Sequence, residues 1–207
     1  MNKKITIPVV VLIAAVAIVS VLYSNGTKDQ AVSEIPLSYD SNSKIQSLLA
    51  TEGITMSNPL KFKGDSIQKY CKFFSDEDTQ DSIQYCTSTE ITDSEGNFVG
   101  NIHMVGNTDS PFAVLGIMQT DPFMSQIDSV KTVTEAMVES LVCDCWKDKK
   151  PGGIESVSDW IDMARSHHLD AKKTTSKSET DGLGQKHLLI EISTNTEGYL
   201  WKFIITN

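Results

Sequence analysis

Apolar residues recur along the chain at two different spacings, and each spacing predicts one kind of element. Alternation at every second position predicts strands over 83–91, 98–105, 112–119, 174–180, 186–194 and 199–206. Spacings of three and four residues predict helices over 44–52, 65–74, 127–145 and 157–168. Short helices, three strands, two helices and three strands follow one another in this order. That order predicts an α+β fold, with an antiparallel sheet covered on one face by helices.

The beginning of the chain has a pattern of another kind. Lys3 and Lys4 precede an uncharged apolar run over residues 5–23. As a helix, this run would be about 28 Å long, close to the hydrocarbon thickness of a bilayer. We expect an uncleaved transmembrane signal anchor, with a cleaved signal peptide as the alternative. Both export the remainder of the chain, because the two lysines stay in the cytoplasm.

These features divide the chain into four expected parts. They are a cytoplasmic N-terminus at 1–4, the transmembrane anchor at 5–23, a polar tether at 24–43 and an extracytoplasmic α+β domain at 44–207. The tether is poor in large apolar residues and rich in Ser, Asn and Asp. The expected location is therefore the cell membrane, crossed once, with the C-terminal domain outside.

The charge balance narrows the choice of partner. The 207 residues include 18 basic and 27 acidic side chains, for a formal net charge of −9. A nucleic-acid-binding surface needs a surplus of Lys and Arg, so this composition argues against nucleic acid as a partner. It argues equally against electrostatic docking on an anionic membrane.

Four cysteines lie in the exported part: Cys71, Cys86, Cys143 and Cys145. An even number in an oxidising compartment predicts two disulfides. Cys143 and Cys145 fall two residues apart on a predicted helix, where side chains diverge by about 200°. We therefore expect each of them to pair with Cys71 or Cys86.

Metal binding is the alternative use of these residue types. The four thiols could hold zinc or copper(I), although their spacing is not that of structural zinc sites. The other candidate ligands are His103 and Met104 on a predicted strand, and His167 and His168 at a predicted helix end. Adjacent strand residues point to opposite faces, so we expect Met to pack and His to face solvent, with no metal and no cofactor.

The leader MNKKITIPVVVLIAAVAIVSVLY and the lysine-rich, arginine-poor body resemble those of small exported proteins of ammonia-oxidising archaea. The resemblance implies a domain beneath a surface layer, an accessory of a membrane enzyme complex or a copper-handling protein. A helix over 158–168 before a strand hairpin is also similar to PsbP-like exported domains. The aromatic-rich opening strands of that family are missing, and we transfer none of its function.

The familiar catalytic motifs are absent from the sequence, among them G-x-S-x-G, H-E-x-x-H, the P-loop, G-x-G-x-x-G and S-x-x-K. We therefore expect a non-catalytic binding or accessory domain with a protein partner in a membrane-associated assembly. An enzyme without a recognisable motif remains the further alternative. An exposed apolar patch would favour a subunit, a pocket would favour a ligand binder, and neither would favour a spacer.

Overall fold

The computed structural model of the chain describes residues 35–207. Residues 1–4, the expected anchor at 5–23 and most of the expected tether lie outside this part. Within it, antiparallel strands and helices confirm the α+β class. The helices of the described part are all too short or too polar to span a bilayer.

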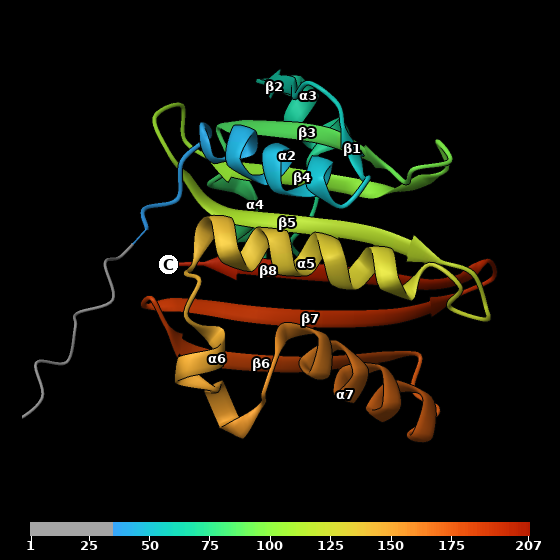
Figure 1. Cartoon of the computed structure of the whole chain (residues 1–207). Coiled ribbons are helices and arrows are strands. Elements are labelled where there is room, and N and C mark those ends of the chain that lie inside the picture. The colour runs from blue at the N-terminus through green and yellow to red at the C-terminus, as the bar shows by residue number, and fades with distance from the viewer. Residues whose placement is uncertain (1–34) are drawn as a thin grey trace, which may run out of the picture. The chain divides into compact units, whose positions relative to one another are not determined.

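The strands form one antiparallel eight-stranded sheet (Figure 1). Their bounds are β1 (Thr55–Met56), β2 (Leu60–Lys63), β3 (Tyr85–Thr92), β4 (Phe98–Gly106), β5 (Pro111–Thr120), β6 (Thr175–Leu183), β7 (Lys186–Asn195) and β8 (Gly198–Thr206). The order is β1-β3-β4-β5-β8-β7-β6, and β2 also pairs with β3. The six strands predicted from alternation are all present, as two meanders joined by the pairing of β5 with β8.

Three helices lie on one face of this sheet: α2 (Ser41–Thr51), α5 (Ile127–Leu141) and α7 (Val157–Asp170) (Figure 1). A Cβ atom on Gly116 of β5 would come within 2.8 Å of Met137 Sδ, so the glycine lets α5 close onto the sheet. Trp160 of α7 is buried, and its Nε1 donates a 2.7 Å hydrogen bond to Ser178 Oγ of β6. Packing therefore satisfies the polar atom of one of the largest core side chains.

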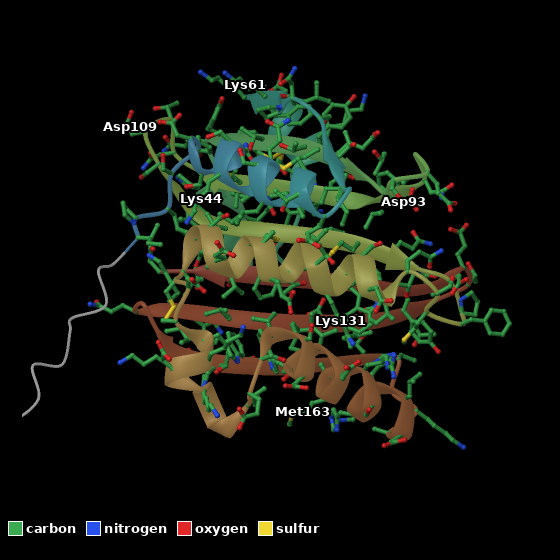
Figure 2. The ribbon with its side chains drawn as sticks, in the orientation of Figure 1. Lys44, Lys61, Asp93, Asp109, Lys131 and Met163 are labelled. Carbon is green, nitrogen blue, oxygen red and sulfur yellow. A yellow bond between two sulfur atoms is a disulfide. The ribbon has the colours of Figure 1, made fainter. Side chains whose placement is uncertain are left out.

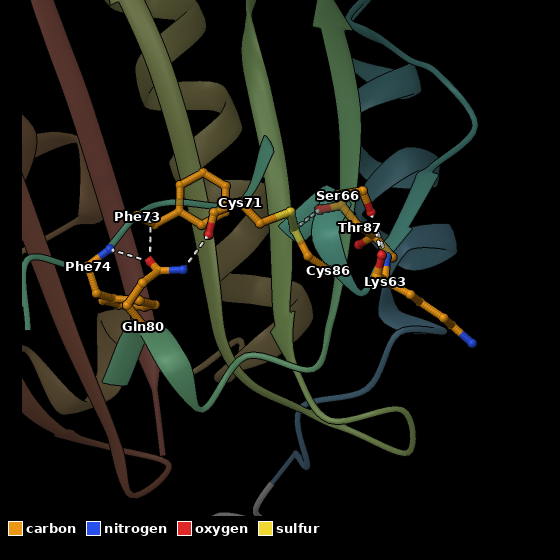
Figure 3. The surroundings of a disulfide bond; sticks show 8 residues. All are labelled: Lys63, Ser66, Cys71, Phe73, Phe74, Gln80, Cys86 and Thr87. Carbon is orange, nitrogen blue, oxygen red and sulfur yellow. Dashed lines mark hydrogen bonds between the residues drawn. A yellow bond between two sulfur atoms is a disulfide. The ribbon is translucent and has the colours of Figure 1, made fainter. Parts of the chain in front are cut away.

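The other face of the sheet is partly covered as well, which the sequence did not predict. Here α3 (Asp65–Tyr70) and α4 (Glu77–Asp81) close a second apolar cluster over β3, β4 and β5. Its buried members are Ile67, Cys71, Ile83, Cys86, Val105, Ala113 and Leu115. Gln80 holds the linking segment, since its Oε1 accepts from the amides of Phe73 and Phe74 and its Nε2 donates to Cys71 O (Figure 3).

The packed part of the chain begins before residue 44, where the sequence predicts the start of the domain. Leu37 is buried, and α2 already starts at Ser41. The ring of Tyr39 packs edge-on against that of Tyr85, with the centroids 4.8 Å apart. Tyr39 also donates a 2.7 Å hydrogen bond to the carbonyl of Asn107. Residues 37–43 are thus part of the folded domain.

The predicted presence of disulfides is confirmed, but the predicted pairing is wrong. Cys71 is bonded to Cys86, with the Cα atoms 6.4 Å apart, and Cys143 is bonded to Cys145, with the Cα atoms 5.1 Å apart. The prediction assumed that the helix continued through residue 145, whereas α5 ends at Leu141. Beyond it, the chain leaves the helical path before α6 (Trp146–Lys149) and the 3-10 turn η1 (Pro151–Gly153), and the two thiols can then meet.

Candidate functional site

The two ends of the sheet carry different loops, and Asp93 and Asp109 mark them (Figure 2). The Asp93 end consists of the β3–β4 turn at 93–97, the segment 121–126 after β5, the β7–β8 turn at 196–197 and the segment 171–174 before β6. The Asp109 end carries the β4–β5 turn, where Tyr39, near the start of the described part of the chain, contacts Asn107.

Large apolar side chains are exposed at the Asp93 end. Phe123 is 92% exposed, and Phe98 at the start of β4 and Leu169 near the end of α7 are exposed too. Because β4, β5 and β8 are neighbours in the sheet, Phe98 and the segment with Phe123 belong to the same stretch of this end. A phenylalanine so completely in water is unusual, since burying its ring stabilises a protein by about 1.5–3 kcal/mol.

The segment that carries Phe123 is held by Asp121. Its Oδ1 accepts hydrogen bonds from the amides of Phe123 (3.0 Å) and Ser125 (2.9 Å), and its Oδ2 accepts from Ser125 Oγ. The hydrogen bond from the Ser125 side chain is the largest cause that lowers the pKa of Asp121. The side chain of Gln126 accepts from the Asp121 amide. Phe123 is therefore presented on a closed, hydrogen-bonded turn.

Gly198 joins this turn to the neighbouring β7–β8 turn. It has a φ of +140°, and a Cβ atom there would lie 2.1 Å from Thr120 O and 2.6 Å from the Asp121 carbonyl carbon. Glycine alone allows this close approach of the two backbones. The side chains of Trp201 and Thr120 add a 3.2 Å hydrogen bond between β8 and β5. The turn that carries Phe123 is thus supported by β5 and β8, the central pair of strands.

A hollow of about 310 Å³ lies at the same end, where α7 meets the last residues of β7. His168, Lys172, Lys173, Thr194 and Tyr199 line it. The Nδ1 of His168 lies 2.9 Å from Ser176 Oγ, and its Nε2 lies 2.9 Å from Thr194 Oγ1. Burial, followed by the neighbouring His167, lowers the pKa of this imidazole. The neutral ring ties the end of α7 to β6 and β7.

Among the three candidate ligand histidines, only His167 has the predicted exposure to solvent. His168 is buried, and so is His103, whose ring packs against Phe73 with the centroids 4.4 Å apart. Burial lowers the pKa of His103 to about 4, with a small opposing effect from the Thr87 carbonyl. The error arose because a lone histidine in an alternating pattern does not reveal which face of the strand is covered.

The candidate metal ligands are not brought together. His103 and Met104 lie on opposite faces of β4, while His167 and His168 lie at the end of α7. Over residues 35–207, no three His, Cys, Asp or Glu side chains are grouped in a way that could hold a metal ion. All four cysteines are in disulfides.

Sequence reasoning missed Phe98 and Phe123. The signal available was a large aromatic residue within turn chemistry, as in the run Asp-Pro-Phe-Met at 121–124. Comparison of the chain with known protein families, with curated proteins and with solved structures finds no match.

Proposed function

We propose that this chain is a non-catalytic binding domain, held outside the cytoplasmic membrane by residues 5–23, that docks a protein partner through the Asp93 end. The exposure of Phe123 is the observation that carries the proposal. Phe98 and Leu169 are further exposed apolar side chains at the same end. The acidic charge of the chain disfavours nucleic acid as the occupant.

The fixed geometry of the turn is a second support. Hydrogen bonds from Phe123 and Ser125 to Asp121 order the turn before any partner arrives. An aromatic anchor carried on an ordered backbone loses less conformational entropy on binding than one on a mobile loop. Such aromatic side chains dominate the binding energy at protein interfaces.

The membrane location is proposed from the apolar run and its preceding lysines, Lys3 and Lys4. The resemblance to small exported archaeal proteins points the same way, towards an accessory role in a membrane assembly. Alkaline extraction of membranes should leave the full chain in the pellet. External protease should digest residues 35–207 in spheroplasts, and a chain found whole and soluble in the cytoplasm would contradict this location.

The partner is tested with the full chain, purified from its native membranes in mild detergent. We expect a protein partner in stoichiometric amount, and Phe123→Ala should weaken its binding by about 2 kcal/mol, or about thirtyfold. Met163→Ala is the matched control, because Met163 is 57% exposed on α7, away from the Asp93 end. A partner that is retained equally by both variants, or a chain that always purifies alone, would overturn the proposal.

A further inference from the structure

The segment 60–72 is strongly basic within an acidic chain. It holds Lys61, Lys63, Lys69 and Lys72, all exposed, and Asp65 is its one acidic residue. The formal net charge of the whole chain is −9, so this segment is positively charged within a chain that is negative overall. We call residues 60–72 the basic segment.

The basic segment forms one edge of the folded domain. Strand β2 pairs with β3, and α3 follows it directly. The Cys71–Cys86 disulfide ties the end of the segment to β3, so its side chains sit on a fixed backbone. Lys61 stands out from this edge in Figure 2.

Apolar side chains accompany the lysines. Leu60 is 65% exposed and Tyr70 is 50% exposed. The rings of Phe62 and Tyr70 stack with centroids 5.0 Å apart, and Lys69 Nζ lies 4.9 Å from the Tyr70 ring centroid. Along β2 the lysines point to one side and Leu60 to the other, so cationic and apolar side chains flank the same edge of the sheet. Such an edge suits the boundary between lipid headgroups and acyl chains, where lysines contact phosphates and tyrosine rings lie at the interface.

The basic segment also lies beside the point where the chain enters the domain. Lys63 Nζ is 5.0 Å from the ring centroid of Tyr85, and the ring of Tyr39 also contacts Tyr85, with the centroids 4.8 Å apart. Residue 39 is five residues into the described part of the chain. The segment 24–34, between the expected anchor and the first described residue, can extend over at most about 40 Å.

We propose that the basic segment docks the folded domain on an anionic lipid surface, with the lysines at the headgroups and Leu60 and Tyr70 in the interface. This inference rests on the proposed anchor, because the tether keeps the domain within reach of the bilayer and makes a weak contact intramolecular. The remaining acidic surface is repelled by the same lipids, so contact is confined to this edge. Electrostatic attraction to anionic lipid, which the net charge of the whole chain disfavours, is favourable at this edge.

The test uses the full chain with vesicles of phosphatidylcholine, with or without phosphatidylglycerol. Flotation of the chain with the vesicles shows whether the proposed anchor inserts. Hydrogen exchange of the amides of residues 60–72 shows whether the basic segment contacts the lipid. We expect exchange in the basic segment to slow by about fivefold with phosphatidylglycerol only, and to recover in high salt. The double variant Lys61→Glu/Lys69→Glu should lose this protection. Lys172→Glu/Lys173→Glu, with the same charge change at the Asp93 end, should keep it.

The outcomes separate the contact from the anchor. A chain that floats with both lipids but exchanges equally in both has an anchor and no docking, which overturns the inference. A chain that floats only with phosphatidylglycerol, and is protected in the basic segment, supports docking and refutes the anchor. Flotation with neither lipid refutes both, and neither measurement depends on the partner tested through Phe123.

Discussion

Cys143 is bonded to Cys145, only two residues along the chain, and the bridge lies where α5 has just ended. Cys143 lines a hollow of about 220 Å³ together with Glu139 and Asp144, and Cys145 is partly exposed. Cys71 and Cys86 are instead wholly buried in the cluster over β3, β4 and β5. The two disulfides therefore differ in their access to solvent.

This difference predicts an order of reduction. Dithiothreitol under native conditions should reduce Cys143–Cys145 well before Cys71–Cys86, because thiol exchange requires a thiolate to reach a sulfur atom. Trapping of the free thiols with iodoacetamide, followed by peptide mass spectrometry, measures how far each disulfide has been reduced. Simultaneous loss of both bridges, or earlier loss of the buried one, would show that exposure does not set the order.

The same two bridges should differ in their effect on stability. Replacing Cys71 and Cys86 by Ala should lower the free energy of unfolding by about 3 kcal/mol, as expected for a loop of about 15 residues. Replacing Cys143 and Cys145 by Ala should cost about half as much, because the closed loop is very short. Urea unfolding of the two double variants measures the difference, and equal losses would contradict it.

Acid should destabilise the domain through His103. Its folded pKa of about 4 lies below the unfolded value near 6.5, so the neutral form is favoured by folding. The resulting stability, about 3 kcal/mol, is fully present above pH 6.5 and declines as the pH falls towards 4.

Urea unfolding at several pH values between 7.5 and 4 should follow this decline, and His103→Leu should flatten it. Asp76, Asp93 and Asp121 have lowered pKa values and titrate below this window. His168 shifts in the same direction as His103, so the difference between variant and wild type isolates one histidine. An unchanged slope in His103→Leu would refute the assignment.

His167 and His168 form a matched pair of neighbours with different roles. His168→Ala removes a buried ring and its contacts with Ser176 and Thr194, and should lower the free energy of unfolding by about 3 kcal/mol. His167→Ala, at an exposed position, should change it by no more than about 0.5 kcal/mol. Thermal unfolding of both variants measures the difference. Similar melting temperatures would show that the contacts of His168 do not stabilise the packing of α7 on the sheet.

The strands that the sequence predicted are those whose alternation is local and long. Strands β3 to β8 appear within a few residues of their predicted bounds for this reason. The two-residue β1 and the four-residue β2 were missed, because their structure comes from pairing with β3, far along the chain. Alternation also marks only one face of a strand, so the cover supplied by α3 and α4 could not be predicted.

The candidate surfaces were harder to predict than the fold. The exposure of Phe123 depends on Asp121 and on the close approach of Gly198, which is 75 residues later. The whole-chain charge concealed the basic segment, although four lysines within residues 60–72 were a visible signal. The error in disulfide pairing came from extending the periodicity of α5 by one turn too many.

The pairing of β5 with β8 has a consequence for how the chain matures. Ala113 of β5 pairs with Thr206 of β8, so the middle of the sheet is completed by the strand that comes last in the order of this domain. Until then the β3–β4–β5 meander has an open edge that another polypeptide could occupy. The domain can therefore close only once β8 has joined the sheet, and a product that stops before β8 would be prone to aggregate rather than be merely weakened.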